Sequence, residues 1–169
     1  MVCLKTNNKV RKLNISKNNI SSDLKMFKMV QNFLNTNKIL EVFDVSYCEI
    51  DQEAGECLGK GLRGNRNLQV LILKGNPIQG AVKEIAKSFV NNKKALCIKE
   101  LDLSKCQIEC QHITKEFVEM IKSPFTTIKS LSLRDNFIKT KAGEMIKDAL
   151  KENKTITKIQ IDYNPLKAQ

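Results

Sequence analysis

Residues 98–108, "IKELDLSKCQI", combine four apolar residues at fixed spacings with a cysteine, Cys106, two residues before the last of them. The pattern reads apolar-x-x-apolar-x-apolar-x-x-(Asn or Cys)-x-apolar. It occurs six times, at residues 10–20, 40–50, 68–78, 98–108, 128–138 and 156–166. The starts are separated by either 28 or 30 residues. Recurrence at so constant a period predicts a repeat architecture rather than a single globular unit.

Each template begins as a strand and is followed by a helical pattern. Leu101 and Leu103 alternate with polar neighbours, as in a strand with one buried face. Between templates, apolar residues recur every three to four positions, which predicts amphipathic helices at 51–62, 80–90 and 141–150. Asp51 and Thr140 are the expected N-caps of two of these helices. Each unit is therefore predicted to be strand, turn, helix and loop.

This pattern resembles the leucine-rich repeat family, in particular its long ribonuclease-inhibitor-like subtype with repeats of about 28 to 29 residues. The resemblance implies an α/β solenoid shaped as a horseshoe, with parallel strands on the concave face and helices on the convex face. Each repeat buries its apolar face by stacking on its neighbours. We expect one domain over residues 1–169, in which residues 1–9 are the tail of a preceding repeat and six repeats start near 10, 40, 68, 98, 128 and 156.

The polar template position explains the cysteine. In leucine-rich repeat proteins this side chain turns inward and bonds to backbone groups of the turn, because an unpaired buried amide costs about 1–3 kcal/mol. Cysteine is compact and tolerates burial, although it makes only weak hydrogen bonds. The resemblance thus implies a structural ladder, with Cys106 as one of its members. The ladder residues are Asn18, Cys48, Asn76, Cys106, Asn136 and Asn164.

The sequence gives less support to a metal-binding or catalytic role for this cysteine. Cys106, Cys110 and His112 lie close together in "CQIECQH" and superficially suggest half of a zinc site. A closed zinc site needs four ligands, and no second cluster follows at a suitable spacing. A catalytic pair of Cys110 and His112 lacks an orienting third group, and the sequence has no glycine-rich phosphate loop. We therefore predict no enzyme activity, no metal, no cofactor and no small-molecule substrate.

Outward-facing positions around each strand are the predicted partner-binding surface. In the template these are the third, fifth, seventh and eighth residues, and they define the concave face that the resemblance implies. Val42, Tyr47, Val70 and Ile72 are expected to lie together as an apolar hot spot, unless the chain covers them or the assigned facing slips by one residue. A second group joins Tyr163 to its charged neighbours. The candidate residues are Val42, Asp44, Tyr47, Val70, Ile72, Lys74, Asp102, Arg134, Asp162 and Tyr163.

Charge bears on the kind of partner. The net charge of +11 favours acidic partners such as the tails of tubulin, although biased base composition of the gene would also enrich lysine. The outward positions carry six basic and five acidic residues, a net of only +1, which argues against a nucleic-acid groove. Residues 1–39 hold eight basic residues and one acidic residue, a net of +7, so the first repeat is the most basic portion.

The expected function is a non-catalytic protein–protein interaction scaffold or adaptor, a structural subunit of a larger intracellular assembly. Fold-level analogy suggests a cytoskeletal or axonemal assembly, hence a cytoplasmic protein of the cytoskeleton or cilium. No apolar run is long enough for a membrane span or a signal peptide. The alternative is a GTPase-activating regulator of a small GTPase, although the acidic tail of such proteins is absent. Neither end carries a dedicated cap, which favours a piece of a longer solenoid or a subunit covered by neighbours.

Overall fold

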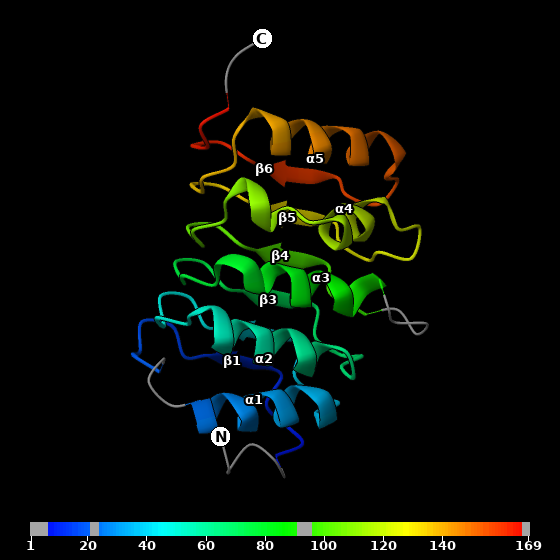
Figure 1. Cartoon of the computed structure of the whole chain (residues 1–169). Coiled ribbons are helices and arrows are strands. Elements are labelled where there is room, and N and C mark those ends of the chain that lie inside the picture. Colours follow the sequence, from blue (N-terminus) through cyan, green and yellow to red (C-terminus); the bar gives the residue numbers. More distant parts are fainter. Residues whose placement is uncertain (1–6, 21–23, 91–95, 167–169) are drawn as a thin grey trace.

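The computed structural model describes residues 7–20, 24–90 and 96–166, and these form a two-layer α/β solenoid. Each of the six templates contributes one three-residue strand to a single parallel sheet, in chain order. Figure 1 shows the helices as one row on one side of this sheet. The strands are β1 (Lys12–Asn14), β2 (Val42–Asp44), β3 (Val70–Ile72), β4 (Glu100–Asp102), β5 (Ser130–Ser132) and β6 (Lys158–Gln160).

The sheet keeps one register from end to end. The central residue of each strand pairs with the central residue of the next, as Phe43 does with Leu71 and Leu71 with Leu101. These three central side chains are buried under the helices. The residues on either side of them therefore point to the opposite face of the sheet, because side chains alternate along a strand.

Five α-helices cover the buried face. They are α1 (Leu24–Thr36), α2 (Gln52–Leu62), α3 (Val82–Val90), α4 (Lys115–Lys122) and α5 (Thr140–Glu152). The helix predicted at 80–90 is divided into a 3-10 turn, η2 (Gln79–Ala81), and α3, and a second 3-10 turn, η3 (Cys110–His112), precedes α4. The core lies between the helix row and the sheet and consists mainly of aliphatic side chains.

Of the two predicted N-caps, one is confirmed and the other is wrong. Asp51 accepts a hydrogen bond from the backbone N–H of Ala54 at 2.9 Å, as an N-cap does. Thr140 is instead the first residue of α5. The Gly143 N–H already donates to the carbonyl of Lys139 at 3.0 Å, so Lys139 holds the N-cap position, without a side-chain cap.

Asn76 ties two neighbouring repeats together inside the core. Its side-chain nitrogen donates to the carbonyls of Val45 (2.8 Å) and Leu73 (2.7 Å). Its side-chain oxygen accepts from the N–H groups of Cys48 (2.9 Å) and Ile50 (3.0 Å). One buried amide thus satisfies four backbone groups, three of which belong to the preceding repeat.

Asn136 makes the same set of bonds two repeats later. Its nitrogen donates to the carbonyls of Leu103 and Leu133, both at 2.9 Å. Its oxygen accepts from the N–H groups of Cys106 (2.9 Å) and Ile108 (3.0 Å). The repetition of four contacts at equivalent positions indicates that the asparagine at the end of the strand fixes the geometry of the turn.

The thiol of Cys106 occupies the corresponding place in its own repeat. Its sulfur lies 3.4 Å from the carbonyl oxygens of Leu73 and Ser104, so the S–H group points into the stack of turns. Burial raises the pKa of this thiol to about 12. Cys106 is therefore a neutral, weak donor between two asparagines rather than a nucleophile.

Backbone conformation distinguishes the cysteine repeats from the asparagine repeats. The residue after each ladder cysteine, Glu49 or Gln107, has a left-handed conformation with φ of 57° or 55°. The equivalent residues Pro77 and Phe137 do not have positive φ. With the extra left-handed residue, the two N–H groups on either side of it point at one asparagine oxygen of the next repeat.

The two outer ladder asparagines, Asn18 and Asn164, each lack part of the set of hydrogen bonds that Asn76 makes. Asn18 is exposed, and its amide donates to the carbonyls of Ile15 and Ser16 in its own turn. Asn164 is half-buried, donates to Leu133 at 2.9 Å and accepts from the N–H of Ile138 at 3.0 Å. The ladder is thus complete in the inner repeats and partial at the ends.

A second set of asparagines stands three residues before four of the six templates, where the chain enters the strands. The side chain of Asn65 accepts from Leu68 N–H at 2.8 Å and donates to the carbonyl of Leu34, near the end of α1, at 2.7 Å. The same acceptor role belongs to Asn7, Asn37 and Asn153. Asn7 therefore resembles the end of a preceding repeat, although residues 1–6 of the predicted tail lie outside the described residues.

The Asn136→Ala substitution tests the ladder. It leaves two N–H groups and two carbonyls of buried turns without their partner, so we expect a loss of about 3 kcal/mol in the free energy of unfolding. The matched Asn18→Ala variant should lose less than about 1 kcal/mol. Urea denaturation followed by circular dichroism measures both. Equal losses would contradict the role given to the buried amide.

The thiols give a second prediction. Cys106 should resist alkylation in the native protein at pH 8, because it is buried and its pKa is raised to about 12. The half-buried Cys97 should be alkylated before Cys106. Site-resolved mass spectrometry after iodoacetamide treatment separates these cysteines. Native Cys106 reacting as fast as Cys97 would show that the turn stack opens readily.

Candidate functional site

The sheet face opposite the helices, here called the strand face, carries the first and third residues of each strand. On it Val42 pairs with Val70, and Ile72 lies two residues beyond Val70 on β3. All three are half-buried, so part of each side chain is open to solvent. They form a continuous apolar area across two adjacent strands, which we call the apolar strand patch.

The acidic residues beside this patch accept hydrogen bonds from the turns that follow their strands. A carboxylate oxygen of Asp44 accepts from the N–H and the hydroxyl of Ser46, at 2.9 and 2.7 Å. Asp102 accepts from the N–H of Ser104 at 2.9 Å. Both aspartates were predicted as partner-binding residues, and the structure gives them a turn-stabilising contact as well. Ser46 and Ser104 are themselves buried, although the template placed them on the outward surface.

The turns after the strands form a second row of side chains, here called the turn edge. The eighth template residue has a left-handed backbone in every repeat, with φ between 54° and 74°. This conformation is sterically unfavourable except for glycine, and its recurrence shows that the inward-turning ladder requires it. The turn-edge residues are Lys17, Tyr47, Gly75, Lys105, Asp135 and Tyr163.

Tyr47 lies on this edge rather than on the strands. A Cβ atom placed on Gly75 would come within 2.4 Å of the Tyr47 ring, so the ring lies against the bare backbone of the next turn. Gly75 thus has two reasons to be glycine: its positive φ of 74° and the space that the ring occupies. Tyr47 remains exposed, with 41% of its surface accessible.

The predicted group around Tyr163 is brought together at the other end of the edge. The Arg134 guanidinium lies 4.6 Å from the centre of the Tyr163 ring, in a cation–π arrangement. The same guanidinium donates to a carboxylate oxygen of Asp162 at 2.9 Å. Between the fourth and fifth repeats, Lys105 and Asp135 form an ion pair at 3.1 Å. All four charged side chains are about half exposed.

A cavity of about 290 Å³ opens between these two groups, here called the turn-edge pocket. Four of its residues were predicted as partner-binding, while Ser104, Lys105 and Asp135 were not selected. Their template positions identified them as outward-facing, but not as part of a shared cavity. The lining residues are Tyr47, Lys74, Ser104, Lys105, Arg134, Asp135 and Tyr163.

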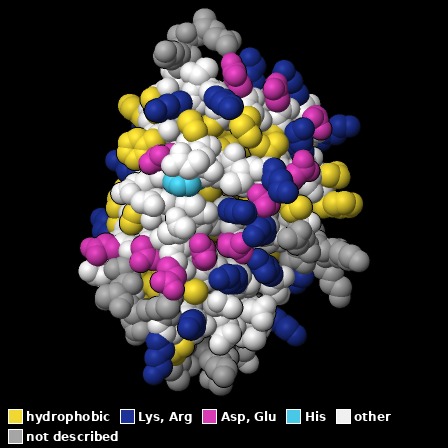
Figure 2. All heavy atoms as spheres, in the orientation of Figure 1, with side chains coloured by type: hydrophobic (Ala, Val, Ile, Leu, Met, Phe, Trp, Pro, Cys, Tyr) yellow, Lys and Arg dark blue, Asp and Glu magenta, His cyan; other side chains and the backbone are white. Residues whose placement is uncertain are grey.

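The helix-covered side carries charges of both signs. Figure 2 shows basic and acidic side chains mixed over this side, with apolar side chains scattered between them. A second cavity, of about 350 Å³ and mainly apolar, lies at the end of the solenoid between α5 and β6, where Leu150, Ile159 and Leu166 are only partly covered. Beyond β6 the described chain contributes no further helix to cover them.

The cysteine–histidine cluster is dispersed by the fold. The Cys106 thiol is buried, whereas the sulfur of Cys110 accepts from the N–H of Lys139 at 3.3 Å. His112 accepts from the N–H of Glu109 at 3.0 Å, and burial lowers its pKa despite the nearby Glu109 carboxylate. Within residues 7–20, 24–90 and 96–166, no three His, Cys, Asp or Glu side chains are grouped to hold a metal ion.

The described helices also lack any segment long and apolar enough to span a bilayer.

Comparisons with known proteins agree with this architecture. A family model described as "Leucine Rich repeat" matches residues 6–23, 36–59 and 64–81, which fall in the first three repeats. No curated protein matches the sequence. The family match is consistent with the long, ribonuclease-inhibitor-like subtype.

Two solved structures share the fold at low sequence identity. One is described as leiomodin-1 actin-binding site 2, with a TM-score of 0.62 and 16% identity, covering 86% of this chain and 82% of that chain. The other is the tropomodulin C-terminal domain of Caenorhabditis elegans, with a TM-score of 0.63 and 15% identity, covering 86% and 85%. The family match and the six-strand parallel sheet built from the template support a leucine-rich repeat protein, and the two solved structures share its fold.

Proposed function

We propose that this protein is a non-catalytic interaction scaffold that binds a protein partner on its strand face, as a structural subunit of a cytoskeletal assembly. The apolar strand patch carries the proposal. Val42, Val70 and Ile72 lie on neighbouring strands and are not covered by the helices. A compact apolar area with charged residues around it is the usual composition of a protein-binding hot spot.

The rigidity of the platform supports this role. The patch is held by strands in one register and by turns whose amides are satisfied within the core. A partner that docks on such a surface loses little of its binding free energy to reordering the scaffold. Surface lysines would accelerate the encounter with an acidic partner, because the net charge is +11.

The kind of partner is suggested by the structural neighbours and by charge. One neighbour is described as an actin-binding site, which makes actin the first partner to test. Tubulin, whose tails are acidic, is the second, because it would complement the basic chain. Placement in the cytoplasm, with the cytoskeleton or a cilium, is part of the same proposal.

The Val70→Lys substitution tests the strand face. Lysine at this position can pair with Glu100 directly across β4, which helps to retain the fold, but it places a charge in the centre of the patch. We expect binding to actin filaments or microtubules to weaken by about ten-fold or more. Co-sedimentation at increasing filament concentration gives the dissociation constants.

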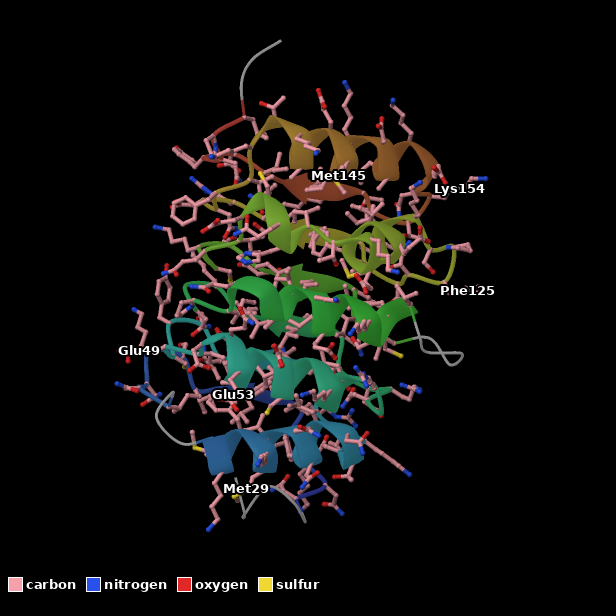
Figure 3. The ribbon with its side chains drawn as sticks, in the orientation of Figure 1. Met29, Glu49, Glu53, Phe125, Met145 and Lys154 are labelled. Carbon is pink, nitrogen blue, oxygen red and sulfur yellow. The ribbon has the colours of Figure 1, made fainter. Side chains whose placement is uncertain are left out.

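Met145→Lys is the matched control, because it also replaces an apolar residue by lysine. Met145 is 37% exposed on α5, and Figure 3 shows it on the helix row. It should leave filament binding unchanged. An equal loss in both variants, or no binding of the original chain to either filament, would overturn the proposal. Stimulated GTP hydrolysis by a small GTPase in the presence of the chain would instead support the regulatory alternative.

A further inference from the structure

We propose that the turn-edge pocket binds an acidic peptide segment, with its carboxylates held by Lys74, Lys105 and Arg134 between the rings of Tyr47 and Tyr163. The inference deepens the proposed function and rests on it in one respect: the segment belongs to the protein partner. It assigns that partner a chemistry and a second point of attachment beside the strand face.

The two tyrosines set the length of the site. Tyr47 belongs to the second repeat and Tyr163 to the sixth, so they are separated by four strand spacings, or roughly 19 Å. The Tyr47 ring is fixed against Gly75, and the Tyr163 ring is fixed against Arg134. An extended peptide spans this distance with about six residues. The rings give such a peptide an apolar contact at each end.

The cations between the rings are available to a ligand. Lys74 has no ion-pair partner in the part of the chain that the structure describes. Lys105 and Arg134 are paired with Asp135 and Asp162, but these pairs are about half exposed and contribute little to stability. Incoming carboxylates can therefore replace the internal aspartates at small cost.

The charges in and beside the pocket favour a short anionic ligand over a long one. Three cations and one carboxylate line it, and the neutral Ser104 lies between them. On the adjoining strand face stand Glu100 and Asp102, which would repel a long polyanion laid across the sheet. A short acidic peptide along the turn edge avoids these residues, whereas a nucleic-acid strand laid across the sheet would meet them.

Fluorescence anisotropy of the full chain with fluorescein-labelled hexaglutamate tests the proposal at low salt. Lys74→Ala should weaken binding by about five-fold, since it removes the one cation without an internal partner. Lys154→Ala removes the same charge far from the pocket. Figure 3 shows Lys154 on the opposite side of the molecule from Glu49, which belongs to the turns. This control should change binding by less than about 1.5-fold.

A substitution that is expected to strengthen binding distinguishes an effect on the pocket from a general loss of folding. Asp135→Asn removes the carboxylate that competes for Lys105, so it should strengthen hexaglutamate binding about two- to three-fold. Asparagine is suitable because it tolerates the left-handed backbone at this position. Asp148→Asn, which breaks an equivalent exposed pair with Lys151 on α5, should leave binding unchanged.

Three outcomes would overturn the inference. Equal losses for Lys74→Ala and Lys154→Ala would show that only the overall charge attracts the peptide. Labelled hexathymidylate binding as tightly, with the same dependence on Lys74, would identify a nucleic-acid site instead. If hexaglutamate does not bind while Val70→Lys still weakens filament binding, the pocket is not a peptide site and the proposed function stands. Hexaglutamate binding without filament binding would contradict the proposed function and leave the peptide site standing.

Discussion

A parallel strand that turns inward at its end buries backbone amides that no neighbouring strand can satisfy. In this protein the side chains of Asn76 and Asn136 supply the missing partners, each with two donors and an oxygen that accepts twice. The other features of the edge follow from this contact. It lies beside the left-handed eighth residue that every template shares, and Tyr47 and Lys105 at this position lie on the turn edge beside the strand face.

Asparagine and cysteine have different roles in this ladder. A cysteine repeat brings its own two N–H groups to the asparagine of the next repeat, and the left-handed Glu49 or Gln107 makes that convergence possible. Cys106 then needs to be only small, neutral and buried. The second asparagine set, represented by Asn65, secures the other end of the strand by bonding to the end of the preceding helix. The neutral amides of Asn65 and Asn76 thus hold the two ends of β3.

The recurring template, through its resemblance to leucine-rich repeat proteins, was sufficient to predict the parallel sheet, in which the strands pair in one register. The buried centres of the strands, such as Phe43, followed from the same template. The start of α5 did not, because Thr140 and Lys139 differ only in which carbonyl accepts the first helical bond. The candidate site was predicted as columns of residues. The pocket depends on side-chain directions across five repeats, including the Tyr47 ring lying on Gly75, and a template carries no information on those.

Residue-resolved amide hydrogen exchange of the unmodified chain tests the central role of the asparagine side chains most directly. The N–H groups of Cys106 and Ile108 point only at the Asn136 oxygen, not at another backbone carbonyl. The ladder account predicts that they exchange as slowly as the strand amide of Leu103, through global unfolding. Exchange of these two amides as fast as that of Lys9 on the exposed entry loop would contradict it.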